Sequence, residues 1–232
     1  MILGGLAKTT LLDYPGRIAC TVFTSGCNLR CPFCHNASLV IPRPERHGAY
    51  LYEGDFFSFL EKRKGILDGV VVSGGEPLMQ ADIEDFLYKI KSMGYSIKLD
   101  TNGSFPDKLT SVINSELVDY VAMDIKNSPE KYLLTSGRDV LDEVRRSVDL
   151  ILSSSIEYEF RTTAVAQLHT EDDFKAIGEW IKGAKRYFIQ CFKDSGDILG
   201  GENKYSPPSR RDLETFINAV KAPIPSASLR GI

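Results

Sequence analysis

The predicted strands end at intervals that match one strand plus one helix. Apolar runs end at Thr24, Ser73, Asp100, Asp124, Thr163 and Cys191, and the last five ends lie 27, 24, 39 and 28 residues apart. Intervals of this length are typical of strand–helix units joined by crossover connections. The alternation therefore predicts a mostly parallel sheet with six main strands.

We expect the fold class to be α/β, as a partial (β/α)6 TIM-like barrel with parallel strands and an N-terminal β-ribbon. Six units suit an open, partial barrel better than a closed barrel of eight, with a doubly wound flat sheet as the alternative. Loose alternation over residues 1–15, ending in the turn at 14–16, predicts the ribbon. We expect one domain over residues 1–232, with a core at about 17–193 and a C-terminal helix and tail at 209–232.

Hydrophobic periodicity locates the individual elements. It predicts main strands at 17–24, 69–73, 95–100, 117–125, 157–165 and 185–191, and an extra strand within 225–230. It predicts helices at 54–64, 83–90, 106–115, 140–151, 170–181 and from about 209. Thr170 and Asp173 have the spacing of a capping box. Proline and charge predict a break at 42–48, and His47 and His169 are expected in loops.

Glycine-rich and polar motifs follow four of the predicted strands. They are the cysteine loop at 27–34, Gly-Gly-Glu at 74–76, Asp-Thr-Asn-Gly at 100–103 and Asp-Ile-Lys at 124–126. In barrel enzymes the carboxyl ends of the strands form the active-site rim. Packing alone does not explain four such motifs at one rim, so we predict an active site there.

Three cysteines lie close together in the loop after the first main strand. Cys27, Cys31 and Cys34 have the spacing C-x3-C-x2-C, which indicates a metal centre. A [4Fe–4S] cluster held by three thiolates keeps one iron open for a small molecule. A structural zinc site would need a fourth ligand, and His35 beside Cys34 is poorly placed to supply it.

The composition excludes several classes of function. The net charge of −3 provides no basic stripe for nucleic acid, and five cysteines with three clustered do not form a disulfide framework. Cys20 and Cys191 fall inside predicted strands, where we expect them to pack in the core. Neither a signal segment nor an apolar run of about 18 residues is found. We expect a cytoplasmic protein that binds neither nucleic acid nor membrane.

The cysteine loop resembles that of the radical S-adenosylmethionine enzymes, with Phe33 in the aromatic position before the third cysteine. Together with residues 9–16 and 23–28, it is similar in particular to activating proteins of anaerobic ribonucleoside-triphosphate reductase, over nearly the whole chain. The resemblance implies a [4Fe–4S] cluster on the three cysteines and S-adenosylmethionine on its open iron. It further implies a 5′-deoxyadenosyl radical, a glycyl-radical enzyme as partner, and a reductant such as flavodoxin or ferredoxin.

The resemblance also implies roles for the glycine and aspartate motifs. Gly74 and Gly75 would bind the amino group of the methionine moiety, with Glu76 orienting the turn, although a tight turn alone also explains two glycines. Asp100, Thr101 and Asp124 would hold a monovalent cation beside the cofactor carboxylate. Residues 100–103 are otherwise explained as a strand followed by an Asx-type turn.

The later strands supply the remaining expected contacts. Lys126 would bind the carboxylate or ribose side of the cofactor, as would Arg161, against the alternative of a surface lysine. The resembling pyruvate formate-lyase activators have a ribose-contacting histidine on the sixth strand, which is absent from residues 190–193 here. The expected cofactor-binding residues are Phe33, Gly74, Gly75, Glu76, Asp100, Thr101, Asn102, Lys126 and Arg161.

Three other functions stay open at this point. The chain could activate another glycyl-radical enzyme such as pyruvate formate-lyase, or it could modify a small metabolite such as a deazapurine precursor. As a non-catalytic electron-transfer or sensor protein it would need a fourth thiolate, from Cys20 or Cys191. Cysteines are absent between Cys34 and Ser73, which favours a single cluster and a compact activating enzyme.

Overall fold

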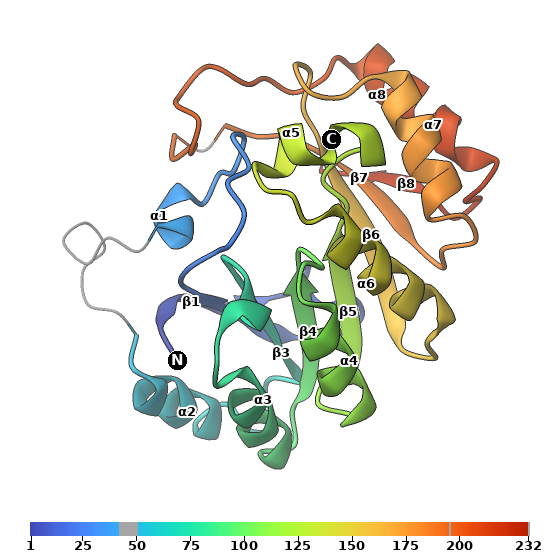
Figure 1. Ribbon diagram of the computed structural model, residues 1–232. Helices are drawn as coiled ribbons and strands as arrows, with labels where there is room; N and C mark the ends of the chain where they lie inside the picture. Colours follow the sequence, from blue (N-terminus) through green and yellow to red (C-terminus); the bar gives the residue numbers. More distant parts are fainter. Residues whose placement is uncertain (42–50, 195, 232) are drawn as a thin grey trace. The chain divides into compact units, whose positions relative to one another are not determined.

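The computed structural model describes residues 1–41, 51–194 and 196–231 (Figure 1). In these ranges eight strands pair in chain order, from β1 (Leu3–Thr10) to β8 (Ser228–Arg230). Because β1 and β8 end this order, the described sheet is open rather than closed into a ring. The α/β class, the partial barrel and the N-terminal ribbon are confirmed. The predicted break at 42–48, with His47, lies outside the described residues.

The six predicted main strands and six predicted helices are found within a few residues of their expected bounds. The strands are β2 (Ala19–Thr24), β3 (Gly69–Gly74), β4 (Ser96–Thr101), β5 (Tyr120–Asp124), β6 (Glu157–Ala164) and β7 (Tyr187–Cys191). The helices are α2 (Glu53–Glu61), α3 (Ile83–Ser92), α4 (Pro106–Asn114), α6 (Leu141–Ser153), α7 (Glu171–Trp180) and α8 (Arg210–Lys221).

Over residues 1–41, 51–194 and 196–231, four short helical segments were not predicted. They are α1 (Ala37–Val40), α5 (Tyr132–Ser136) and the 3₁₀ turns at Pro77–Met79 and Pro129–Lys131. Segments of three to five residues are too short to display a helical period, so hydrophobic patterning does not detect them. One of them, α5, contacts the cysteine loop.

The described chain divides into two compact units, each with its own internal contacts. The first covers residues 1–28, 38–101 and 107–121, and the second covers 29–37, 102–106 and 122–232. The cysteine loop and β5 both pass from one unit to the other. We describe each unit by itself, and the single domain over residues 1–232 stays a prediction.

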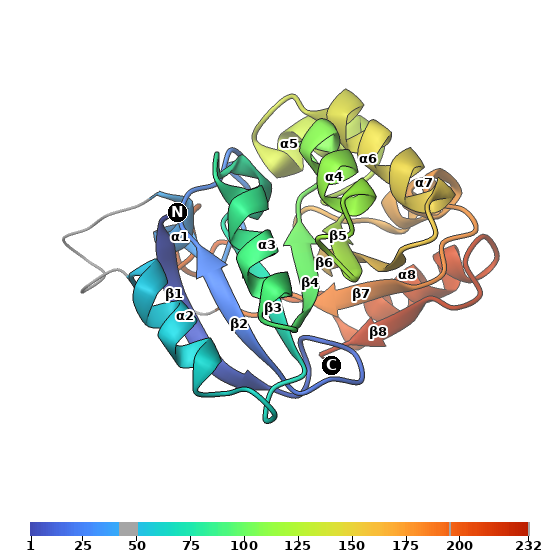
Figure 2. The same cartoon turned by 90° about the horizontal axis from the view of Figure 1, so that it is seen from below.

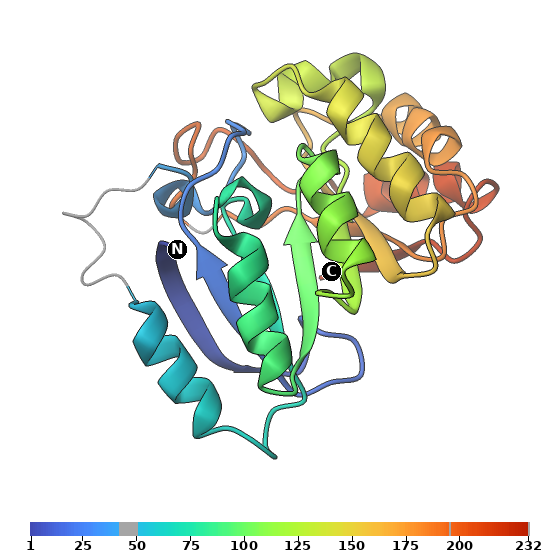
Figure 3. The same ribbon diagram turned by 60° about the horizontal axis from the view of Figure 1, so that its bottom comes forward.

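The first unit is a sheet covered by α2 and α3. Strand β1 is antiparallel to β2, and β2, β3 and β4 are parallel, with Cys20 opposite Val70 and Val70 opposite Ile97. These three side chains have no exposed area, as expected for strands buried on both faces. The rings of Phe56 in α2 and Phe86 in α3 stack with centroids 5.4 Å apart, and Figure 3 shows the two helices along this part of the sheet.

The second unit pairs β6, β7 and β8 in parallel, and Figure 2 shows β7 and β8 side by side. Helices α7 and α8 pack through Phe174 and Phe216, whose rings stack at 4.5 Å. The predicted capping box of α7 is confirmed, because Thr170 and Asp173 exchange side-chain to backbone hydrogen bonds. Within the described ranges, each helix is too short or too polar to cross a membrane.

Candidate active site

The loop that carries the three cysteines joins β2 to α1. Cys27 belongs to the first unit, whereas Cys31 and Cys34 belong to the second. Cys31 is buried and Cys34 is half-buried, and the Cys34 amide donates to the Cys31 carbonyl at 3.0 Å. The five cysteines all lie in the described ranges and form no disulfides, so the three in the loop are not excluded as ligands.

The two remaining cysteines lie in strands, and Cys20 is buried in the core as the sequence predicts. Cys20 in β2 has no exposed area, and burial raises the pKa of its thiol to about 12. A thiol with that pKa stays protonated at neutral pH and is a poor metal ligand. Cys191 is half-buried at the end of β7.

The second unit holds its part of the cysteine loop from two directions. On one side, the Arg30 amide donates to the carbonyl of Ser136, the last residue of α5, at 2.8 Å. Gly137 ends α5 in a left-handed conformation with φ 68°, and a Cβ there would lie 2.7 Å from the Arg30 carbonyl oxygen. On the other side, the Gly200 amide donates to the Pro32 carbonyl at 2.8 Å. The loop is therefore fixed by backbone contacts.

The aromatic residue of the loop packs against a histidine. Phe33 is buried, and its ring meets the ring of His169 edge-on with centroids 6.5 Å apart. His169 lies in a loop, as predicted, but it is buried, and burial lowers its pKa. The Val165 amide donates to its Nδ1 at 3.1 Å, which leaves Nε2 to donate to the Lys126 carbonyl at 3.0 Å. The sequence assigned His169 no such role.

The Gly-Gly-Glu motif makes a close fit with the backbone that precedes Cys27. A Cβ on Gly74 would lie 2.3 Å from the Thr24 amide nitrogen, and a Cβ on Gly75 would lie 2.1 Å from the Gly26 carbonyl oxygen. Gly74 also has φ 123°, which only glycine adopts readily. The Gly75 amide donates a hydrogen bond to the Thr24 carbonyl oxygen at 3.0 Å. The two glycines are therefore required by packing in this unit, whatever ligand they also contact.

Glu76 has the turn-orienting role that the sequence predicts. Its side chain has no exposed area, and Oε1 accepts hydrogen bonds from the Leu78 amide at 3.0 Å and from the Thr101 hydroxyl at 2.8 Å. A buried carboxylate is tolerated when donors surround it. Glu76 thus ties the end of β3 to the end of β4.

Asp100 lies at the end of β4 and is paired within the first unit. Its carboxylate forms an ion pair with the buried ammonium group of Lys98 and accepts a hydrogen bond from the Ser73 hydroxyl at 3.1 Å. In the second unit, Asn102 Oδ1 accepts from the Ser104 amide at 2.9 Å, which is the predicted Asx-type turn.

Asp124, Lys126 and Arg161 form a charged cluster in the second unit. Lys126 Nζ lies 2.9 Å from Asp124 Oδ2, and Arg161 Nε lies 2.9 Å from Asp124 Oδ1. The three side chains are between 13% and 30% exposed. Two cations therefore converge on one carboxylate at the end of β5. The contacts of Lys126 and Arg161 with a carboxylate of the cofactor stay a prediction.

Electrostatics keep this cluster ionised. Burial opposes the charge of Asp124, but Arg161 and Lys126 hold the pKa of that carboxyl well below its usual range. Burial likewise opposes the charge of Lys126, and the negative charges of Asp124 and Cys31 raise its pKa. Because Asp100 and Asp124 each pair with a side-chain cation, a monovalent cation bound by them would share these carboxylates. That cation site stays a prediction.

The profile of the radical SAM superfamily matches residues 21–181 of the chain, which include all three loop cysteines and the motifs at the ends of β3, β4 and β5. The chain belongs to the radical SAM superfamily. It is therefore an enzyme that generates a radical, and members of the superfamily use a [4Fe–4S] cluster and S-adenosylmethionine.

Radical SAM proteins similar to this chain include two activating enzymes. A Methanocaldococcus jannaschii protein with the provisional name of glycyl-radical enzyme activating enzyme is 29% identical over 238 residues, covering 100% of this chain and 96% of its own. The pyruvate formate-lyase-activating enzyme of Listeria monocytogenes is 36% identical over 137 residues, covering 53% of this chain and 52% of its own.

A solved structure has a similar fold. Streptococcus suis SuiB bound to its precursor peptide SuiA superposes with a TM-score of 0.70 at 13% sequence identity. The superposition covers 90% of this chain and 47% of that one.

The residues present fit the iron–sulfur cluster that the superfamily uses. The loop thiols are not consumed by disulfides, and Cys31 lies within reach of the positive charge of Lys126. Among the described residues, His, Cys, Asp and Glu side chains do not gather in groups of three that could hold one metal ion. Cysteines of a cluster each bind a different iron and need not converge on a single ion. Cys27, Cys31 and Cys34 would hold the cluster.

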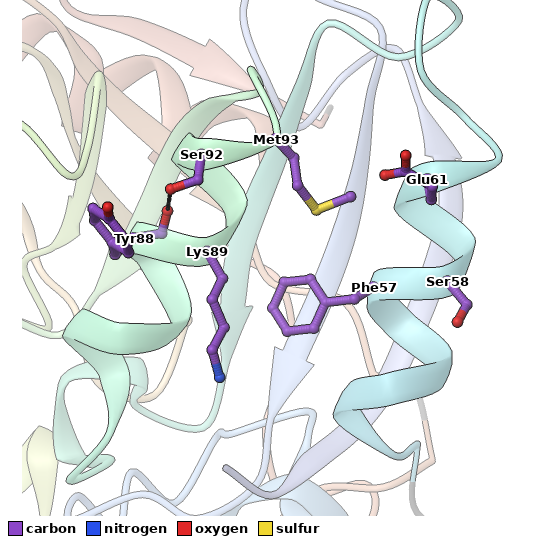
Figure 4. Close-up of a pocket in the computed structure, with 7 residues that line it drawn as sticks. All are labelled: Phe57, Ser58, Glu61, Tyr88, Lys89, Ser92 and Met93. Atoms are coloured by element: carbon purple, nitrogen blue, oxygen red, sulfur yellow. Dashed lines mark hydrogen bonds between the residues drawn. The ribbon is translucent and has the colours of Figure 1, made fainter.

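A separate groove lies away from all predicted site residues. It has a volume of about 520 Å³ and runs between α2 and α3 in the first unit. Figure 4 shows Phe57, Met93 and Tyr88 around it, with Lys89 and Glu61 at its sides. The Lys89 ammonium already lies 3.8 Å from Glu53 and over the Phe57 ring. The groove therefore adds no residue to the radical SAM site.

Proposed function

We propose that this chain generates a glycyl radical on an anaerobic ribonucleoside-triphosphate reductase. The glycyl-radical chemistry of the proposal rests on the similarity to the Methanocaldococcus protein, because that alignment spans 100% of this chain and 96% of its relative. The choice of a reductase as target rests on the resemblance of the cysteine loop and of residues 9–16 and 23–28. Insertions that would hold a second cluster are absent, since all other cysteines of the chain lie in strands. A compact activating enzyme needs one cluster and a surface for a protein substrate.

Cys27, Cys31 and Cys34 would hold the cluster, which would supply one electron for cleavage of S-adenosylmethionine into methionine and a 5′-deoxyadenosyl radical, the species that would take a hydrogen atom from the target glycine. The residues of the chain bind and orient the cofactor. Gly74 and Gly75 would bring their backbone close to its amino group, and the cations of Lys126 and Arg161 would attract its carboxylate. Asp100, Thr101 and Asp124 would place a monovalent cation beside the same carboxylate. No general acid or base is required.

Activation of pyruvate formate-lyase is the second candidate. It is favoured by the higher identity of 36% to the Listeria activating enzyme, although that alignment covers 53% of this chain. Both candidates use the same chemistry and differ in the protein that presents the glycine. The reductant would be a flavodoxin or a ferredoxin in either case.

The test compares the two target enzymes side by side. Reconstituted protein is mixed anaerobically with S-adenosylmethionine, a chemical reductant and either the reductase or pyruvate formate-lyase. We expect a doublet glycyl EPR signal on the reductase, together with release of 5′-deoxyadenosine. A signal on pyruvate formate-lyase alone would favour the second candidate.

Matched cysteine variants make this test specific. Cys34→Ala should abolish both the signal and the nucleoside, whereas Cys191→Ala should retain them, because Cys191 lies in β7 and not in the loop. Nucleoside release in the presence of a small metabolite, without a glycyl signal on either protein, would replace the proposal with metabolite modification.

A further inference from the structure

Four buried polar side chains connect the segment after β5 to the segment that leads into α7. They are Asn127, Ser128, His169 and Asp173, each at most 5% exposed, and all belong to the second unit. Polar groups are costly to bury, and a buried network fixes one geometry when its members are hydrogen-bonded. The four are not among the residues expected to bind the cluster or the cofactor, so another role is needed to explain them.

Three hydrogen bonds join the two segments. Asn127 Nδ2 donates to the carbonyl oxygen of the residue before His169 at 3.0 Å. The Ser128 hydroxyl donates to Asp173 Oδ1 at 2.9 Å, and His169 Nε2 lies 3.0 Å from the Lys126 carbonyl oxygen. The backbone at 126–128 is thereby fixed to the segment that leads into α7, and with it the point from which the Lys126 side chain leaves the backbone.

The hydrogen bond of His169 has a definite direction. A carbonyl oxygen only accepts, so Nε2 must carry the proton in the bond to Lys126. Nδ1 faces the Val165 backbone, with the amide nitrogen at 3.1 Å and the carbonyl oxygen at 3.3 Å. Burial lowers the pKa of His169, so the ring is neutral at pH 7 and Nδ1 accepts from the amide.

The ring of His169 also reaches the cysteine loop. It lies between two aromatic rings, with its centroid 6.5 Å from that of Phe33 and 5.7 Å from that of Phe174 in α7. Phe33 is buried and directly precedes the third cysteine of the loop. His169 therefore contacts two residues that are expected to bind the cofactor, Phe33 through its ring and Lys126 through its hydrogen bond.

We propose that His169 is a positioning residue for S-adenosylmethionine, whose hydrogen bond to the Lys126 backbone directs the Lys126 ammonium group to the cofactor carboxylate. The ammonium group of lysine sits on a flexible four-carbon stem, so a fixed backbone reduces the conformational freedom that is lost on binding. The inference rests on the proposed contact of Lys126 with that carboxylate. It assigns His169 no contact of its own with the cofactor.

The test is a double-mutant cycle on cofactor binding. Lys126→Met removes the ammonium group and keeps the carbonyl that His169 contacts, whereas His169→Asn leaves no donor at the position of Nε2. The Kd for S-adenosylmethionine is measured by anaerobic isothermal titration of reconstituted protein without target protein. We expect Lys126→Met to raise the Kd about tenfold or more and His169→Asn to raise it roughly three- to tenfold. The double variant should bind no more weakly than Lys126→Met, because His169 acts through Lys126.

His169→Gln is the matched variant. Its side-chain amide nitrogen can take the place of Nε2, which the shorter side chain of His169→Asn cannot do. Both variants lose the ring contacts with Phe33 and Phe174, so both should unfold at a similarly lower urea concentration than the parent chain. We expect His169→Gln to bind the cofactor close to the parent value, in contrast to His169→Asn.

Tyr158→Phe controls for a loss of stability alone. Tyr158 is buried at the start of β6, and its hydroxyl accepts a hydrogen bond from the Lys185 amide at 3.1 Å. We expect this variant to unfold at a lower urea concentration and to bind S-adenosylmethionine with an unchanged Kd.

The outcomes separate this inference from the contact on which it rests. If Lys126→Met binds the cofactor like the parent chain, the proposed contact of Lys126 is wrong and this inference is wrong with it. If Lys126→Met weakens binding and His169→Asn does not, the inference alone is overturned. Additive effects in the double variant would also overturn it, as would equally weak binding by His169→Gln and His169→Asn.

A measurement on the parent chain does not depend on the folding of variants. In the reconstituted chain with ¹⁵N-labelled histidine, the ring that contacts Phe174 should be neutral and protonated on Nε2 at pH 7. Its Nε2 proton should exchange slowly with water, because it is buried in a hydrogen bond. Protonation on Nδ1 alone, or rapid exchange of the Nε2 proton, would overturn the proposal.

Discussion

The Gly-Gly-Glu motif of the first unit and Asp124 of the second unit are held by different means. In the first unit, Gly74, Gly75 and Glu76 are fixed by backbone fit and by hydrogen bonds to neutral groups, and a Cβ on either glycine would clash with backbone atoms. In the second unit, Asp124 is held by two ion pairs at 2.9 Å, and its side chain is 30% exposed.

The backbone fit at Gly74 and Gly75 is a rigid contact, whereas the ion pairs of Asp124 can exchange one charged partner for another. Backbone atoms packed at van der Waals distance cannot move without strain, so the first unit offers a fixed surface. Partly exposed charges can exchange partners at little cost, so the second unit offers charges that a ligand can recruit. Substitution of Gly74 or Gly75 should therefore affect folding, and substitution of Asp124 should affect binding.

The largest expected effect tests whether the second unit supplies essential cluster ligands. Cys31→Ala should lower the iron content of reconstituted protein from about four per chain to near zero, because two thiolates hold a cluster poorly. Iron analysis and the EPR spectrum of the reduced protein measure the loss. Cys20→Ala, a buried thiol outside the loop, should keep its iron. Full iron occupancy in Cys31→Ala would contradict the three-cysteine assignment.

The next effect tests the rigid contact of the first unit. Gly75→Ala places a Cβ 2.1 Å from the Gly26 carbonyl oxygen, so the backbone must shift. We expect the free energy of unfolding to fall by about 3 kcal/mol or more, measured by urea denaturation. The control is Gly54→Ala in α2, where the added Cβ meets no atom within 4 Å. It should be neutral or stabilising by up to about 1 kcal/mol. Equal stability of the two variants would mean that the first unit is not rigid there.

A smaller effect tests the exchangeable charges of the second unit. Asp124→Asn removes the carboxylate that orients Lys126 and Arg161. We expect the fold and the cluster to be retained and the Kd for S-adenosylmethionine to rise about tenfold, which corresponds to about 1.4 kcal/mol. Isothermal titration under anaerobic conditions measures it.

Asp149→Asn, on the exposed face of α6, should bind the cofactor like the parent chain. If monovalent cations strengthen cofactor binding in the parent chain and not in Asp124→Asn, the predicted cation site gains support. Unfolding of Asp124→Asn would instead make the charged cluster structural.

The smallest effect is a pH dependence in the second unit. Burial opposes the charge of Asp173, but hydrogen bonds from Lys131, Thr170 and Ser128 hold its pKa below the ordinary value. A depressed pKa stabilises the folded state above the unfolded value of about 3.9 and loses that contribution as the pH falls. Asp173→Asn should therefore cost about 1 kcal/mol at pH 7 and progressively less below about pH 4.

Urea denaturation across this pH range checks the prediction, with Glu171→Gln on the exposed side of the same turn as the control. If the loss of stability in Asp173→Asn does not change with pH, the carboxylate stabilises the fold through the geometry of its hydrogen bonds and not through its charge.

The sequence by itself determined the order of elements, the capping box at Thr170 and the three-cysteine loop. Each of these depends on neighbours within a few residues, or on a hydrophobic period that repeats along the chain, and so is visible in one dimension. The motifs at the ends of β3, β4 and β5 could be located for the same reason, although the contacts of Glu76 with Thr101 could not.

Only the tertiary structure decided which residues support the loop. The hydrogen bond between His169 Nε2 and the Lys126 carbonyl joins residues 43 positions apart. The contact between the Cys31 sulfur and the Ser136 carbonyl joins residues 105 positions apart. Helix α5 has only five residues and so shows no helical period, yet its last residue, Ser136, accepts a hydrogen bond from the Arg30 amide of the cysteine loop. These contacts join residues that are far apart in the sequence, so local sequence patterns do not predict them.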